Sequence, residues 1–345
     1  MRAQVFGALL LASNSCATSR QAADERRAEA RDREPPRASE TADPILPLPH
    51  SRTLDAGRVA LGASLFQSPL LSGDASVSCA SCHHEQQGWA DRAAHTQVAA
   101  RPATALNVPT LANLQYYFYF SWNGAYDDLA AHADSLLENP DIMGTTWSAV
   151  AARLAHAPGW QERFAAGFST GLRPENIRAA LVEYEASLSM PDSPFDRWLQ
   201  GDGSAISVAA ERGYRLFESR GCVSCHQGML LGGNLFQRLG VMRDYDPAAM
   251  AKALHAEPAP ARESRAELGR FTLTGREEDR HVFRVPSLRN VALTAPYLHD
   301  GSVATLADVV DIMAEYQLGE LLGPDENQSI VQFLDTLSGR SQGAP

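Results

Sequence analysis

The motif Cys-x-x-Cys-His occurs twice in this chain, at 79–83 and at 222–226, and uses four of the five cysteines. Each copy follows the pattern Gly-x-x-Leu-Phe, at 62–66 and at 213–217. Apolar side chains at helical spacing precede both motifs. The repetition predicts two related helical modules, each built around one cysteine motif.

Three chemistries use closely spaced cysteines. A structural zinc site pairs two Cys-x-x-Cys knuckles at short separation, whereas the two motifs here are far apart in the chain. A thioredoxin-like redox pair has a βαβ setting and needs no histidine after the second cysteine. Covalent c-type haem explains every element, because two thiols form thioethers to the vinyl groups and the next imidazole ligates the iron. We therefore predict two haems and keep zinc and a redox pair as weaker alternatives. The predicted haem-binding residues are Cys79, Cys82, His83, Cys222, Cys225 and His226, the histidines being the proximal ligands.

The rest of the sequence favours a mainly α fold of two cytochrome c-like helical domains. Helical periodicity occurs in five stretches, at 54–66, 146–168, 174–187, 208–217 and 327–337. The 345 residues suffice for two domains with cores of their own. The small, polar stretch 201–207 is the expected boundary. We therefore expect an N-terminal domain over 46–203 and a C-terminal domain over 204–345.

The first residues predict export. MRAQVFGALLLASNSC has one early arginine, a short apolar run and then small residues, which is typical of a secretory signal peptide over 1–16. Cys16 stands where a bacterial lipoprotein would be cleaved and acylated, so a lipid anchor and plain cleavage remain alternatives. Residues 17–45 have almost no large apolar side chains and are expected to be a disordered linker. The predicted location is the periplasm.

Net charge excludes one class of partner. The formal net charge is −11, and no concentration of Lys and Arg is present to bind phosphates. We therefore expect no nucleic-acid partner.

Three longer segments resemble a single protein family. They are VFRVPSLRNVALTAPYLHDGSV at 282–303 followed by ATLADVVDIM, LGASLFQSPLLSGDASVSCASCH at 61–83, and FSWNG at 120–124. Together they resemble the bacterial di-haem cytochrome c peroxidase family, which includes the MauG-like enzymes. The resemblance covers nearly all of 54–339.

The resemblance implies the remaining axial ligands. Met313 would be the second ligand of the C-terminal haem, and a thioether ligand raises the reduction potential. MauG-like members have Tyr at this position, so Met313 favours the peroxidase branch; the alternative is that Met313 fills the core. The family also has a removable histidine on the loop after the first motif. His95 is the candidate there, although it comes earlier than the family's spacing; the alternatives are a surface histidine and an open iron.

Two more roles follow from the resemblance. Trp122 matches the aromatic residue that lies between the two haems and would shorten the electron's path, although an indole can equally serve packing. A calcium ion would lie where the modules meet, with oxygen ligands that suit a hard cation. The implied calcium ligands are the side chain of Asn107 and the backbone carbonyls of Thr294 and Pro296.

The residues for proton transfer depart from the family pattern. The family's catalytic Glu in N-P-x-E-M is replaced by Ile142 in the segment Asn-Pro-Asp-Ile-Met at 139–143, and the family's Gln position holds His132. Either His132 or Asp141 then transfers the proton, since a histidine or a carboxylate can act as an acid-base group. Otherwise the site no longer cleaves peroxide efficiently. In that case His132 is either a haem ligand or a surface residue.

We therefore predict a peroxidase that reduces hydrogen peroxide to water with electrons from a small periplasmic redox protein, a cytochrome c or a cupredoxin. Two alternatives remain. One is a non-catalytic di-haem electron carrier or redox sensor, and the other is a MauG-like enzyme that oxidises a partner protein. The resemblance also suggests a homodimer.

Overall fold

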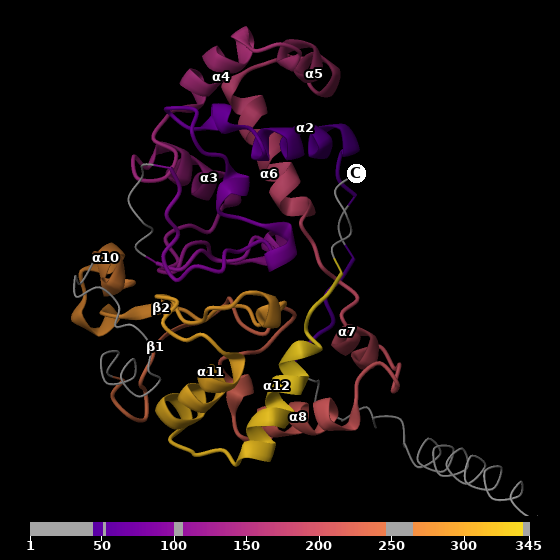
Figure 1. Ribbon diagram of the computed structural model, residues 1–345, viewed down its shortest axis with the longest axis vertical. Coiled ribbons are helices and arrows are strands. Elements are labelled where there is room, and N and C mark those ends of the chain that lie inside the picture. Colours follow the sequence, from indigo (N-terminus) through magenta and orange to yellow (C-terminus); the bar gives the residue numbers. More distant parts are fainter. Residues whose placement is uncertain (1–43, 51–52, 100–105, 246–264, 341–345) are drawn as a thin grey trace, which may run out of the picture.

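The computed structural model describes residues 44–50, 53–99, 106–245 and 265–340. The predicted signal peptide, Cys16 and nearly all of the predicted linker lie outside these residues. The described chain forms two lobes, one above the other in Figure 1, with helices at the two far ends. Within the described ranges, no helix has both the length and the apolar character that a membrane crossing requires.

The N-terminal lobe is a group of helices around one apolar core. Its helices are α2 (Ala56–Phe66), α3 (Leu129–Glu138), α4 (Trp147–His156), α5 (Trp160–Gly167) and α6 (Pro174–Ser187). The Asp55 side chain accepts a hydrogen bond from the Arg58 backbone and so caps the start of α2. The buried faces of α2, α4, α5 and α6 meet in the core, which includes Phe66, Leu154 and Phe164.

The C-terminal lobe has its own core and one small sheet. Its helices are α7 (Pro194–Leu199), α8 (Val208–Ser219), α10 (Phe271–Thr274), α11 (Leu306–Ile312) and α12 (Pro324–Asp335). Strands β1 (Phe236–Arg238) and β2 (Val282–Arg284) pair antiparallel, with Phe236 opposite Arg284. A π-helical turn, Met313–Leu318, continues directly from α11.

The glycine of each Gly-x-x-Leu-Phe repeat lies where two helices cross. In the N-terminal lobe α2 crosses α6, and an ideal Cβ on Gly62 would lie 2.0 Å from the Ala180 carbonyl oxygen. In the C-terminal lobe α8 crosses α12, and a Cβ on Gly213 would lie 1.9 Å from the Ser329 carbonyl oxygen. Only a residue without a side chain permits these approaches, so the repeated glycine fixes the same helix crossing in both lobes.

The mainly α fold of two cytochrome c-like domains is confirmed, with three differences in detail. The periodic stretch 146–168 is divided into α4 and α5, because Pro158 and Gly159 interrupt it. The stretch 201–207 does connect the last two helices before the second motif. However, Phe195 and Trp198 of α7 already pack in the C-terminal core, so the expected boundary at 203 lies within the sequence that builds that core. Ile45, at the end of the expected linker, is also buried there.

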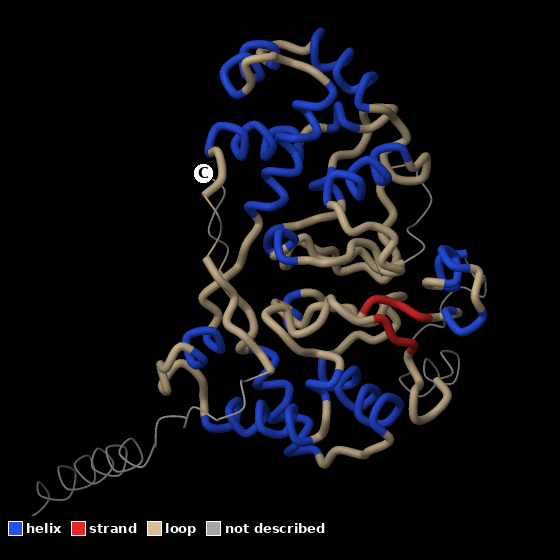
Figure 2. The backbone as a smooth tube through the Cα atoms, turned by 180° about the vertical axis from the view of Figure 1, so that it is seen from behind, coloured by secondary structure: helices blue, strands red, loops and turns tan. Residues whose placement is uncertain are grey.

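Loops rather than helices form the junction of the two lobes (Figure 2). The Arg284 backbone donates to the Trp122 carbonyl at 2.7 Å, and the Asn107 backbone donates to the His299 carbonyl at 2.9 Å. The Asn123 side chain donates to Thr272 Oγ1 at 3.1 Å. Hydrogen bonds therefore hold the FSWNG loop of the first lobe against β2 and the second lobe's longest motif.

Replacing Gly213 tests the role of the repeated glycine. In Gly213→Ala, the added methyl group overlaps the α12 backbone, so we expect the free energy of unfolding to fall by about 1–3 kcal/mol through overpacking. Gly167→Ala in α5 is the control, because its Cβ would meet its nearest neighbour at an ordinary 3.7 Å. Because Gly167 is the last residue of α5, that variant should change the free energy of unfolding by no more than about 0.5 kcal/mol. Urea unfolding followed by circular dichroism measures both, and equal effects would contradict the crossing argument.

Candidate functional site: two cysteine motifs and one cavity

The two Cys-x-x-Cys-His motifs adopt the same local structure. Each begins as a 3-10 turn, at Cys79–Ser81 and at Cys222–Ser224. The His83 backbone donates to the Cys79 carbonyl at 3.1 Å, and the His226 backbone donates to the Cys222 carbonyl at 3.0 Å. One turn therefore presents both thiols and the imidazole of each motif together. All four thiols are free.

The cysteines do not have the properties of a redox pair. Burial is the largest cause that raises the pKa of each thiol, to about 11 for Cys82 and for Cys222. A reactive thiol of a Cys-x-x-Cys redox pair has a lowered pKa instead. The raised thiol pKa values therefore argue against a thioredoxin-like redox pair.

Each motif histidine is held by one ring nitrogen. His83 Nδ1 lies 3.0 Å from the Trp89 carbonyl oxygen, and His226 Nδ1 lies 3.1 Å from the Leu231 carbonyl oxygen. With Nδ1 as the donor, Nε2 keeps its lone pair for a metal ion. The Phe of each Gly-x-x-Leu-Phe repeat packs beside this ring, Phe66 at 6.5 Å from His83 and Phe217 at 6.3 Å from His226, between ring centroids. The repeat therefore orients the histidine as well as the helices.

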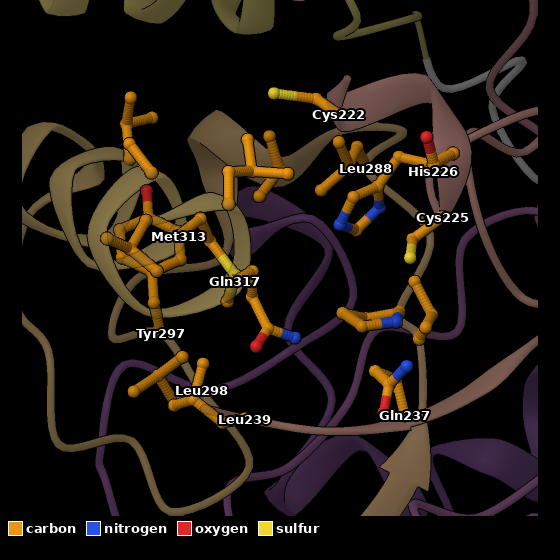
Figure 3. A pocket seen from close by; sticks show the side chains of 18 of the residues that line it. Cys222, Cys225, His226, Gln237, Leu239, Leu288, Tyr297, Leu298, Met313 and Gln317 are labelled. Carbon is orange, nitrogen blue, oxygen red and sulfur yellow. The ribbon is translucent and has the colours of Figure 1, made fainter. Parts of the chain in front are cut away.

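A cavity of about 340 Å³ opens beside the second motif. Cys222, Cys225 and His226 line one part of it, and Met313 lies at another part, where α11 passes into the π-helical turn. In Figure 3 the His226 ring and the Met313 thioether reach the cavity from different sides. Most of the other lining side chains are apolar, among them Phe217, Phe283, Leu288 and Val310. An apolar cavity with two thiols, an imidazole and a thioether fits a haem with two axial ligands.

The helical segment that contains Met313 changes its geometry at that residue. The α-helix ends at Ile312 and Met313 begins the π-helical turn. Such turns are rare and occur often at functional sites. Met313 thus lies at a local irregularity rather than within a regular core helix.

His132 lies in an aromatic cluster of the N-terminal lobe. It is half-buried on α3, and its ring centroid lies 5.6 Å from that of Phe120, stacked, and 5.7 Å from that of Tyr126. Burial, followed by the charges of His83 and Arg284, lowers the pKa of His132 to about 4. These contributions place His132 near the first motif and near the junction of the lobes. It is therefore not the surface residue that the sequence left as an alternative.

The other candidate for proton transfer lies elsewhere. Asp141 is exposed in the turn after α3, and its backbone donates to Asn139 Oδ1 at 2.9 Å. Ile142, at the position of the family's Glu, is half-buried against the N-terminal core. The structure thus brings His132, and not Asp141, into an enclosed cluster.

His95 is half-buried in the loop after the first motif. The same loop contacts the C-terminal lobe through Ala94, which lies against Gly301. Within the N-terminal lobe, the Ala93 carbonyl accepts a hydrogen bond from Asn107 Nδ2 at 3.1 Å. The ligand role of His95 stays a prediction.

Trp122 lies between the two lobes. Its indole nitrogen donates to the Asn107 carbonyl at 2.8 Å, and its side chain lines the cavity of the C-terminal lobe. Asn107 is buried and reaches the His299 carbonyl through its backbone. This brings Asn107 to the segment that contains Thr294 and Pro296, the other implied calcium ligands. No group of three or more His, Cys, Asp or Glu that could hold a metal ion occurs among the described residues.

Sequence reasoning missed several residues around these sites. His299 lines the cavity, stacks on Phe283 at 4.1 Å between ring centroids, and meets Glu267 Oε2 through Nε2 at 2.9 Å. Phe120 and Tyr126 enclose His132. The aromatic run at 116–120 was the available signal, but no spacing rule connects such a run to a histidine on a later helix.

The fold and the two motifs define a class: a protein of two cytochrome c-like helical modules joined face to face by loops. The profile of the di-haem cytochrome c peroxidase family matches residues 56–204. The cytochrome c551 peroxidase of Nitrosomonas europaea is 36% identical over 301 residues, which is 86% of this chain and 84% of that protein. The chain therefore belongs to the di-haem cytochrome c peroxidase family, whose members hold two haems, and the resemblance seen in the sequence is confirmed.

Two further comparisons extend this result. The cytochrome c peroxidase of Escherichia coli is 35% identical over 298 residues, which is 86% of this chain but 61% of that longer protein. The crystal structure of a MauG-like protein associated with microbial copper homeostasis aligns with a TM-score of 0.70 and 28% identity. That alignment covers 87% of this chain and 95% of the other.

One buried carboxyl group lies close to the first motif. Glu185 on α6 is buried, and burial raises its pKa to about 8. After burial, Glu185 is the next cause that raises the pKa of the Cys79 thiol. Glu185 is therefore largely protonated at neutral pH and adds little negative charge to the site.

Glu185 predicts a pH dependence of stability. Its folded-state pKa lies above its unfolded value, so the wild-type protein loses stability as the pH rises from about 4.5 through 8. Glu185→Gln removes this titration, so we expect a flatter stability profile and a more stable variant at pH 8. Glu175→Gln, on the exposed first turn of α6, is the matched control and should keep the wild-type profile. Urea unfolding from pH 5 to pH 8.5 measures this; parallel profiles for Glu185→Gln and wild type would refute it.

Proposed function

We propose that the protein is a periplasmic peroxidase that reduces hydrogen peroxide to water with electrons from a small redox protein. The observation that carries the proposal is the unequal surroundings of the two motif histidines. His226 shares its cavity with Met313, whereas His83 has His132 and its aromatic neighbours nearby. Two haem sites with different ligands suit a division between electron storage and peroxide chemistry.

The four motif cysteines would attach two haems covalently, and His83 and His226 would ligate the irons. Each bound haem would supply an iron that accepts or passes electrons, and at an open position would bind peroxide. In the C-terminal lobe, Met313 would be the second protein ligand of the iron and would thereby exclude peroxide. The thioether would also raise the reduction potential there, so electrons from the donor would collect in this lobe.

In the N-terminal lobe, His132 would handle the proton. Its lowered pKa keeps the imidazole neutral at physiological pH, so it is able to accept a proton from peroxide and donate it to the departing oxygen. Phe120 stacks on this ring and Tyr126 packs against it at a tilt, so both would help to fix its orientation. His95 would be the removable second ligand for the iron that His83 holds.

Trp122 would connect the two lobes for the electron. It lines the cavity of the C-terminal lobe and is fixed by hydrogen bonds to the junction on both sides, through its indole nitrogen and its carbonyl oxygen. A fixed aromatic ring at this position would shorten the gap that the electron crosses.

The finer assignments belong to the same proposal. A calcium ion held by Asn107, Thr294 and Pro296 would lock the junction, and carbonyl and amide oxygens suit that ion. The donor would be a cytochrome c or a cupredoxin. Export through residues 1–16, a lipid anchor at Cys16 and a homodimer complete the proposal.

The proposed function is tested by the oxidation of reduced cytochrome c after addition of hydrogen peroxide. The haem-loaded protein, reduced at one haem, should consume two equivalents of reduced cytochrome c for each peroxide. An absence of turnover, with both haems present, would favour an electron carrier or sensor. Oxidation of a partner protein's side chains instead of cytochrome c would favour a MauG-like activity.

Two substitutions separate the candidates for proton transfer. His132→Ala should lower kcat/KM for peroxide by roughly 10²–10⁴-fold, which is the usual contribution of general acid-base catalysis. Asp141→Asn should leave kcat/KM close to the wild-type value, because Asp141 is exposed and outside the cluster. The reverse order of effects would show that Asp141 is the acid-base group.

If Met313 is a ligand of the C-terminal haem, replacing it should change the reduction potential of that haem. Met313→His keeps six ligands around the iron but replaces the thioether with an imidazole, so the potential of the C-terminal haem should fall. Met143→Leu, which changes a buried methionine of the N-terminal core, is the control and should leave that potential unchanged. An optical redox titration measures both, and an unaltered potential in Met313→His would refute the ligand assignment.

A further inference from the structure

Two buried arginines lie five residues apart in the C-terminal lobe, and among the described residues only Arg289 pairs with a carboxylate. Arg289 is 2% exposed, and its guanidinium lies 2.7 Å from Asp196 Oδ1. It also donates to the carbonyls of Met229 and Leu46. Arg284 is 4% exposed, and no ion pair joins it to a carboxylate among the residues that the structure describes.

The Arg284 side chain makes only neutral contacts. Its Nε donates to the Ser121 carbonyl at 3.3 Å, and its Cζ lies 5.1 Å from the centre of the Tyr117 ring. Its Nη1 is buried and has no hydrogen-bond partner. This guanidinium therefore has a buried donor group without an acceptor among the described residues.

An unpaired buried charge is costly, and Arg284 cannot avoid the cost by losing its proton. Arginine remains protonated in proteins, although burial lowers its pKa here. Tyr117 does not supply the missing anion, because burial raises its pKa and keeps the phenol neutral. The site therefore requires an anion from outside the described protein atoms.

The position of Arg284 indicates where that anion comes from. Arg284 lies at the end of β2, opposite Phe236 of β1, and lines the same cavity as His226 and Met313. Its backbone is also bound to Trp122 at the junction of the lobes. A haem in this cavity brings two carboxylates, and a buried guanidinium matches a carboxylate in charge and in geometry.

We propose that Arg284 binds a propionate carboxylate of the haem in the C-terminal cavity and thereby raises that haem's reduction potential. The inference rests on the proposed haem occupancy and deepens it. A positive charge paired with the propionate offsets negative charge near the iron, which favours the reduced form. Arg284 then acts as a positioning and tuning residue, joining the haem to the backbone that holds Trp122.

The test is an optical redox titration of the haem-loaded full chain with Arg284→Gln. We expect the redox equilibrium of the His226 haem to shift at least tenfold toward the oxidised form, which for one electron corresponds to about 59 mV. Arg284→Lys keeps the charge without the planar fork, so its shift should be smaller. If Arg284→Gln folds poorly, the potential measured for Arg284→Lys still tests the role of Arg284.

Arg212→Gln is the matched control. Arg212 lies on α8 of the same lobe, but it is exposed and does not line the cavity, so solvent screens its charge. Its replacement should leave both potentials close to wild type. Equal potentials in Arg284→Gln and wild type, or a fall confined to the His83 haem, would overturn the assignment.

A second readout keeps this inference distinct from the proposed function. The pyridine haemochrome spectrum counts the covalent haems in each preparation. Fewer than two haems in the wild-type protein would contradict the proposed function itself. Two haems with unchanged potentials in Arg284→Gln would contradict only the role of Arg284.

Discussion

The structure depends most on one hydrogen bond that is made twice, from the Nδ1 of a motif histidine to a backbone carbonyl. This bond selects the ring nitrogen that remains for iron and fixes the plane of the imidazole. The preceding helix supports it, because its glycine permits a close helix crossing and its phenylalanine packs beside the histidine ring. Both lobes therefore position their motif histidine in the same way, with a close helix crossing, a neighbouring phenylalanine and a backbone carbonyl.

Function would arise from what differs around the two histidines. His226 shares an apolar cavity with a thioether, whereas His83 has a histidine enclosed by aromatic rings nearby. The junction then joins these unlike sites through backbone hydrogen bonds at Trp122, Asn107 and Arg284. Because these bonds join loops and the end of β2 rather than the core helices, modest changes of sequence there can alter the coupling between the sites without disturbing either helical core.

The sequence was sufficient for the features that repeat or that follow helical periodicity. The sequence alone identified the two motifs, the repeated glycines and the helical stretch 174–187, which is α6 in the structure. The domain boundary could not be located, because Phe195 joins the C-terminal core through long-range packing rather than local pattern. Nor could the surroundings of His132 or the unpaired state of Arg284 be seen, because both depend on contacts between segments distant in sequence.

The central claim is that one iron is held by His226 and Met313 while the other, at His83, is able to open. Electron paramagnetic resonance of the half-reduced protein tests it most directly, since reduction of the higher-potential haem leaves only the other ferric. Our account predicts a high-spin ferric signal in that state, and its loss on addition of a strong iron ligand such as cyanide. A purely low-spin signal, unchanged by that ligand, would show that the His83 iron keeps a second protein ligand and would contradict the account.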